Sequence, residues 1–100
     1  MLLSNWKTFM ECTMSRTIGQ TLRKAIEFHK AGKLHEAQGL YTAILRLQPK
    51  HPDANHNMGA LAVDLGKLEL SLPYFKKALQ VNPKIPQFWL SFYQALKKLA

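Results

Sequence analysis

The sequence predicts an all-α protein, a solenoid of two full helix-turn-helix repeats followed by one further helix. Residue types recur at one constant spacing, as in the pairs Pro49 and Pro83, Gly32 and Gly66, Lys33 and Lys67, Tyr41 and Phe75, and Leu45 and Leu79. Between these positions the apolar residues follow a helical period. A repeat of about 34 residues with these residue types is typical of stacked helix pairs. We therefore expect a right-handed stack of about five helices from residue 18 onward.

The first predicted repeat covers residues 18–51. Its first helix, 18–31, carries an apolar stripe at helical spacing, and Gly32 can end it because glycine adopts left-handed backbone angles at little cost. The second helix, 34–47, ends before Pro49, because the residue that precedes a proline is pushed out of the helical region. A turn this short requires the two helices to be antiparallel.

The second predicted repeat, 52–85, has the same design. Asp53 and Asn55 are expected to cap its first helix, Gly59 and Ala60 allow a close approach of two backbones, and Gly66 closes the turn.

Pro73 lies near the start of the second helix of this repeat. A proline is tolerated in the first turn, where the missing N–H needs no partner, but it disturbs a helix interior. We therefore expect this helix either to begin late, at Ser71, or to bend.

The two ends of the chain are less regular. Residues 86–100 predict the first helix of a third, incomplete repeat. In residues 1–17, Leu3, Trp6 and Met10 recur at helical spacing, so this segment is either a short docked helix or a frayed arm.

Composition limits the possible functions. The chain carries 14 Lys and Arg against 6 Asp and Glu, a net charge of +8. Such a charge favours acidic partners, but the basic pairs lie on different helices and no aromatic residues alternate with them, which argues against nucleic acid. The sequence shows no secretion signal and no apolar run that could cross a membrane, and Cys12 is its single cysteine. We expect a cytoplasmic protein that does not bind membranes.

The pattern resembles the tetratricopeptide repeat, a helix-turn-helix of about 34 residues with small and aromatic residues at fixed places. Met58, Gly59, Gly66, Phe75, Ala78 and Pro83 match this pattern in the second repeat, and Ala25, Phe28, Gly32, Ala37, Tyr41 and Pro49 match it in the first. Trp89 holds the tryptophan position of the third. Asn55 and Thr21 depart from the pattern, since tryptophan is usual at both places.

The resemblance implies that the first helices of successive repeats line a concave groove that receives a peptide or a partner helix. The groove positions are Leu22, Ile26, His29, Lys30, His56, Asn57, Ala60, Val63, Asp64, Leu90, Ser91, Gln94, Lys97 and Lys98. Lys30, Lys97 and Lys98 favour a ligand of net negative charge. Similar proteins often clamp a C-terminal carboxylate, but only Asn57 falls on a clamp position, while Leu22, Ile26, Gln87 and Ser91 occupy the others.

Catalysis finds little support. His29, His35, His51 and His56 lack a cysteine pair or a carboxylate cluster that would complete a metal site, and Cys12 has no adjacent base. We therefore expect no enzyme activity, no metal and no cofactor. The alternative is that the repeats form the N-terminal region of a longer glycosyltransferase-like or sulfotransferase-like enzyme, since similar bacterial arrays often precede such domains.

The last helix, PQFWLSFYQALKKLA, has almost no polar face. Its apolar residues with the largest predicted role in self-association are Phe88, Trp89, Phe92, Tyr93 and Leu96. Soluble monomers seldom expose such a patch, and repeat arrays normally end on a helix with a polar outer side. The sequence therefore predicts a homodimer that pairs through these ends. The alternative is that the repeats belong to a longer array, whose next helix would cover the patch.

Overall fold

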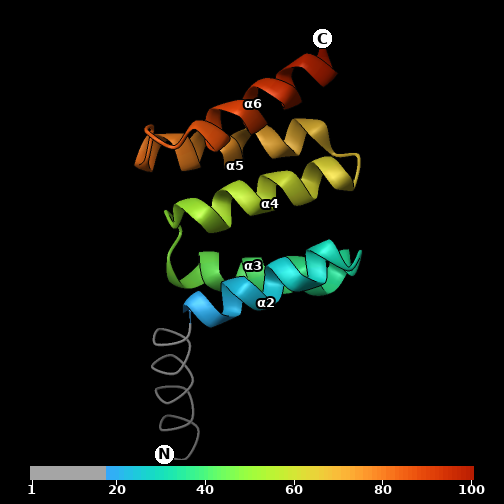
Figure 1. Cartoon of the computed structure of the whole chain (residues 1–100), viewed down its shortest axis with the longest axis vertical. Helices are drawn as coiled ribbons and strands as arrows, with labels where there is room; N and C mark the ends of the chain where they lie inside the picture. Colours follow the sequence, from blue (N-terminus) through green and yellow to red (C-terminus); the bar gives the residue numbers. More distant parts are fainter. Residues whose placement is uncertain (1–17) are drawn as a thin grey trace, which may run out of the picture.

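The computed structural model describes residues 18–100, and these residues form helices without any strand. The helices are α2 (Ile18–Lys30), α3 (Leu34–Leu47), α4 (Pro52–Asp64), α5 (Leu68–Val81) and α6 (Pro86–Leu99). They stack one above another along an elongated body (Figure 1). The predicted all-α repeat fold is confirmed. The prediction for residues 1–17 lies outside the described residues. No helix in residues 18–100 has the length and apolar character needed to cross a membrane.

Two glycine turns repeat the same hydrogen bonds at equivalent positions of the two repeats. Gly32 and Gly66 have φ angles of 80° and 78°, in the left-handed region that favours glycine. After α2, the Lys33 N–H donates to the Phe28 carbonyl at 2.9 Å, and after α4 the Lys67 N–H donates to the Ala62 carbonyl at 2.8 Å. Both bonds satisfy carbonyls that a helix end would otherwise leave without a partner.

The core consists of large side chains from the second helix of each pair set against small residues of the first. Tyr41 of α3 and Phe75 of α5 are 0% and 1% exposed. Tyr41 belongs to a buried cluster with Ala25, Ala37, Met58 and Leu61. Phe75 lies against Gly59, where an added Cβ would stand 2.6 Å from the ring atom Cε1. Gly59 is therefore the residue that lets α5 approach α4 so closely.

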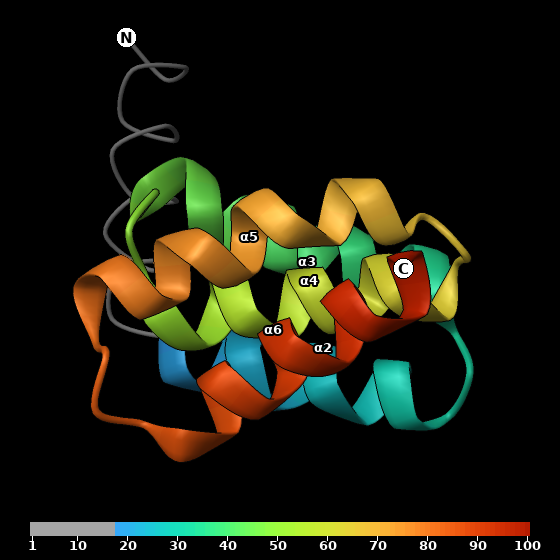
Figure 2. The same ribbon diagram turned by 90° about the horizontal axis from the view of Figure 1, so that it is seen from above.

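Packing differs between the two sides of the stack. Each helix packs against the next along the chain, and α4 also contacts both α2 and α6, whereas α3 and α5 approach each other less closely. Figure 2 looks along the stack and shows α3 and α5 on one side, with α2 and α6 on the opposite side. The helices of successive pairs therefore contact each other along α2, α4 and α6, whereas space remains between α3 and α5.

The predicted caps of α4 are wrong. His51 is the N-cap residue, and its Nδ1 accepts a hydrogen bond from the Ala54 N–H at 3.1 Å. Asp53 stands inside the first turn because Pro52 takes the first helical position. Asn55 is 1% exposed, and its Nδ2 donates to the carbonyls of Pro49 and His51, at 3.0 Å each. The amide thus ties α4 to the preceding loop.

Of the two alternatives for α5, the late start at Ser71 is wrong, because α5 begins at Leu68 and contains Pro73. The bend stays a prediction. Proline removes one helical hydrogen bond, the one that would reach back to the carbonyl of Glu69. Ser71 is buried, and its hydroxyl donates to the Leu68 carbonyl at 2.5 Å. The bond gives the buried Ser71 hydroxyl a partner within the first turn of α5.

Candidate functional site

A hollow of about 230 Å³ lies between α4 and α6, on the side of the stack where these two helices contact each other. Most of its lining residues belong to the predicted groove, namely Ala60, Val63, Asp64, Ser91, Gln94 and Lys98. Phe75 and Ala95 complete the lining. Small and apolar residues therefore form its base, while one carboxylate, one ammonium group, one amide and one hydroxyl stand around it.

The other predicted groove residues do not line this hollow. Leu22 and Ile26 are half-buried and pack against the core cluster around Tyr41. Lys97 lies over the ring of Tyr93, with its Nζ 5.6 Å from the ring centroid. Asn57 is half-buried, while Lys30 and Leu90 are exposed. The structure thus brings the α4 and α6 residues together and leaves those of α2 outside the hollow.

His29 connects three helices next to this hollow. Its Nε2 donates to Asp64 Oδ2 at 2.6 Å, which joins α2 to α4. Its Nδ1 lies 3.3 Å from the hydroxyl of Tyr41 on α3. Burial raises the pKa of Tyr41 to about 12, so the hydroxyl keeps its proton and can donate it to Nδ1. Asp64 is therefore held in place from behind while its side chain stays 53% exposed.

His56 makes a similar connection between α4 and α6. Its Nε2 lies 2.8 Å from Ser91 Oγ, which also accepts a hydrogen bond from Gln87 Nε2 at 3.2 Å. The imidazole stacks on Phe88 with ring centroids 4.8 Å apart. Burial lowers the pKa of His56, and the Asn57 side chain and the Asp53 charge offset part of this effect. The neutral imidazole is the form that this apolar stack favours.

Both histidines bond to the residue 35 positions further along the chain, which lies on the next helix of the same side. Sequence reasoning placed His29 and His56 in the groove but missed their role as bridges. The sequence did contain this information. Two residues separated by one repeat plus one residue lie on adjacent helices of the same side, at neighbouring positions along the helix axes.

We expect His56 to make stability depend on pH. The folded chain holds its pKa below the ordinary value of 6.5, so the unfolded chain binds the proton more readily. This contribution is complete above pH 6.5 and is lost as the pH falls toward the folded pKa. Urea unfolding at a series of pH values should therefore show that wild type loses stability relative to His56→Gln on acidification. His35→Gln, a change at an exposed residue of α3, is the matched control for the loss of an imidazole.

If the difference between wild type and His56→Gln stays constant across this pH range, the imidazole does not titrate in the environment described here.

The predicted self-association residues separate into two groups. Trp89, Tyr93 and Leu96 are between 42% and 58% exposed. Phe88 is not part of that surface, because it is 3% exposed and packs with Ala78 and Leu79 of α5. Phe92 is half-buried against the same cluster. We call Trp89, Tyr93, Leu96 and the neighbouring Leu99, which is 40% exposed, the α6 apolar face.

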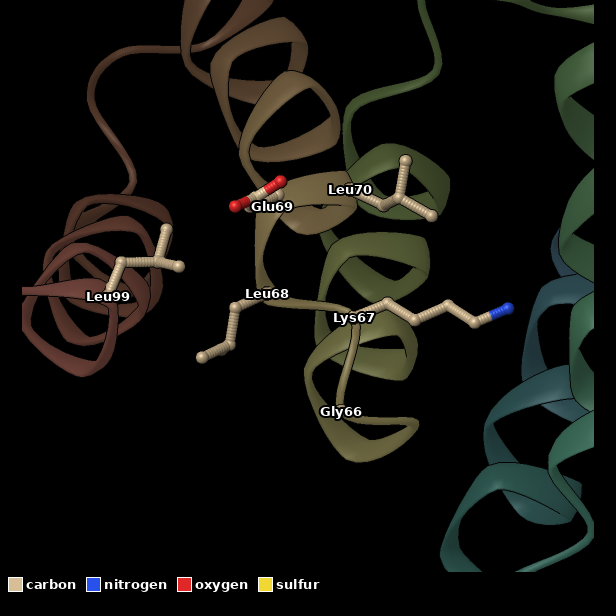
Figure 3. A pocket seen from close by; sticks show the side chains of 6 residues that line it. All are labelled: Gly66, Lys67, Leu68, Glu69, Leu70 and Leu99. Atoms are coloured by element: carbon tan, nitrogen blue, oxygen red, sulfur yellow. The ribbon is translucent and has the colours of Figure 1, made fainter.

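A second hollow, of about 480 Å³, borders this face and opens widely to the surface. Figure 3 shows Leu68 at the start of α5 and Leu99 at the end of α6 on facing sides of it. The Lys67 side chain points away from Leu99, toward the first helix pair. The apolar surface of α6 therefore continues onto α5.

Residues 52–85 match the family model described as the tetratricopeptide repeat. This range contains α4, the glycine turn and α5. It also contains the α4 residues that line the hollow and both ends of the contact between Gly59 and Phe75.

Proposed function

We propose that this tetratricopeptide-repeat-type protein is a protein interaction module, and that a side chain of a peptide or partner helix enters the hollow between α4 and α6. The observation that carries the proposal is the composition of the hollow. Ala60, Val63 and Phe75 give the hollow an apolar lining for a side chain. The polar residues of the lining would meet the backbone or the neighbouring side chains of a ligand.

The hollow suits a side chain better than a cofactor, because about 230 Å³ is less than the volume that drug-sized ligands occupy. Lys98 lines it, and Lys30 and Lys97 stand on the neighbouring helix ends, so we propose a ligand of net negative charge. Asp64 shares a short hydrogen bond with His29 and offers the ligand its remaining acceptor positions. A matching ligand therefore places an acidic group near the Lys98 ammonium group and an N–H group near the Asp64 carboxylate.

Replacing Ala60 by arginine should weaken this binding, because the long side chain fills the hollow and adds a charge beside its apolar residues. The probe is a set of peptides selected from a random display library on the wild-type protein. We expect Ala60→Arg to weaken the selected peptides by about ten-fold or more, the factor that corresponds to about 1.4 kcal/mol. Ala43→Arg adds the same side chain at a half-buried position of α3 and should leave binding unchanged.

Equal binding to wild type and Ala60→Arg would place the ligand elsewhere on the protein. Circular dichroism of both arginine variants verifies that each remains folded.

We also propose that two copies of the chain pair through the α6 apolar face. The four residues of this face are large, apolar and exposed, and Leu99 lines the same hollow as Leu68 of α5. Soluble monomers seldom expose large apolar patches. A two-fold axis through α6 would cover the patch with an identical patch, because such interfaces are self-complementary. Trp89 contributes a fixed ring, since its Nε1 donates to the Pro83 carbonyl at 2.7 Å.

Light scattering over a concentration series should therefore show a dimer that Leu96→Glu converts to a monomer. Gln94→Glu adds the same charge on the other side of α6 and should leave the dimer intact. The chain has two tryptophans, so a Trp6→Phe background lets Trp89 alone report its surroundings. A monomer with a solvent-exposed Trp89 would rule the dimer out. A monomer with a buried Trp89 would indicate that residues 1–17 cover this face instead.

A further inference from the structure

A crevice of about 240 Å³ opens on the side of the stack opposite to the hollow between α4 and α6. It lies between α3 and α5, with α4 as its base, because α3 and α5 each pack on α4 but approach each other less closely. Leu45 and Met58 give it an apolar base. The proposed interaction through α4 and α6 does not involve this crevice.

The charged side chains around the crevice all have the same sign. Arg46 of α3 and Lys77 of α5 line it from facing helices, and none of its lining residues is acidic. A smaller hollow of about 80 Å³ shares Met58 and Tyr74 with the crevice and adds Lys67. Within residues 18–100 the ion pairs are Lys24 with Glu27 and His29 with Asp64, so neither Arg46 nor Lys77 has an acidic partner there. An anion bound between them would be attracted to both.

Asn55, which also lines the crevice, indicates which second group the ligand carries beside its negative charge. Both N–H groups of its amide are in use, one toward the Pro49 carbonyl and one toward the His51 carbonyl. Its Oδ1 is the side-chain atom that remains for a ligand, and it accepts hydrogen bonds. An acceptor suits the N–H of a peptide and repels the oxygens of a phosphate group. The hydroxyls of Thr42 and Tyr74 add donors at the walls.

We propose that this crevice binds an acidic peptide segment, with a glutamate or aspartate carboxylate between Arg46 and Lys77 and a backbone N–H on Asn55 Oδ1. Apolar residues that flank the acidic one contact Leu45 and Met58. Arginine binds a carboxylate through two parallel hydrogen bonds, which fixes the orientation of the segment. The volume of the crevice fits one side chain and its backbone, so the site recognises a short motif.

The probe is the blocked tripeptide acetyl-Leu-Glu-Leu-amide, titrated into the isotope-labelled full chain and followed by amide chemical shifts. We expect shifts at Asn55, Tyr74 and Lys77, and saturation that weakens as salt is added. Acetyl-Leu-Gln-Leu-amide has the same shape without the charge and should bind about ten-fold more weakly, as expected for the loss of a charge-assisted hydrogen bond.

The double variant Arg46→Gln with Lys77→Gln should lose the glutamate peptide to a similar extent. Its matched control is Arg23→Gln with Lys76→Gln, which removes the same charges from exposed positions outside the crevice. Equal losses in both double variants would mean that the net charge of the protein attracts the peptide, and this would overturn the proposal. Equal binding of the two peptides would overturn it as well. If inorganic phosphate at the same concentration displaces the glutamate peptide, the crevice is a general anion site and not a peptide site.

Discussion

Replacing Phe75 by alanine should lower the free energy of unfolding by about 3–5 kcal/mol, the usual cost of removing a large aromatic ring from a core. The ring is 1% exposed, it lies against Gly59 of α4 and it forms part of the lining of the hollow. Its removal would separate α5 from α4 and leave a cavity between α4 and α6. Urea unfolding followed by circular dichroism measures the effect.

Leu70→Ala is the control on the same helix, because Leu70 is 58% exposed and its truncation should change stability by no more than about 0.5 kcal/mol. If Phe75→Ala leaves too little folded protein to measure, Phe75→Leu should retain the fold with a loss of about 1–2 kcal/mol. A loss below about 1 kcal/mol for Phe75→Ala would show that the ring does not hold the two helices together.

Alanine at Gly59 and at Gly39 should change stability in opposite directions, although both glycines lie inside helices. Alanine is the better helix former by about 0.8–1 kcal/mol. At Gly39 an added Cβ meets nothing within 4 Å, so Gly39→Ala should stabilise the protein by about that amount. At Gly59 the Cβ would stand 2.6 Å and 2.8 Å from two ring atoms of Phe75, so Gly59→Ala should destabilise it by about 1–3 kcal/mol.

The double variant Gly59→Ala with Phe75→Leu distinguishes this explanation from a general effect of substitution in α4. A smaller aliphatic side chain can move away from the added methyl group, so the double variant should cost less than the sum of the two single changes. Additive losses would mean that Gly59 and Phe75 do not share one packing contact.

The ends of α2 and α4 were predictable because the residues that end helices act locally. Gly32 and Gly66 stop α2 and α4 at equivalent positions of the two repeats, and both have the positive φ angle that explains the choice of glycine. The fold class followed from this punctuation together with the helical period of the apolar residues between the turns.

The cap of α4 and the partners of the buried polar groups were not predictable in the same way. Ser, Thr, Asp and Asn are the usual caps, so the pattern favoured Asp53 and Asn55 over His51. Burial decided otherwise, because Asn55 lies inside the stack and its amide has to bond to the carbonyls of the loop. A sequence shows neither the depth of a residue nor the direction in which a loop passes over it.

The surface of α6 was predictable only in part. Helical spacing places Phe88, Phe92 and Ala95 on one face, and this face packs toward α5. The prediction that included Phe88 and Phe92 counted the apolar residues of α6 without assigning them to faces. Trp89, Tyr93 and Leu96 lie on the exposed side and remain the candidates for self-association.

We propose that the hollow between α4 and α6 receives the partner, and amide chemical-shift mapping of a display-selected peptide on the labelled protein tests this most directly. We predict that the largest shifts occur at Ala60, Val63 and Gln94, and that the Ala60→Arg variant shows none of them. The largest shifts on α3 and α5, with those three residues unchanged, would contradict the claim and assign the partner to the opposite side of the stack.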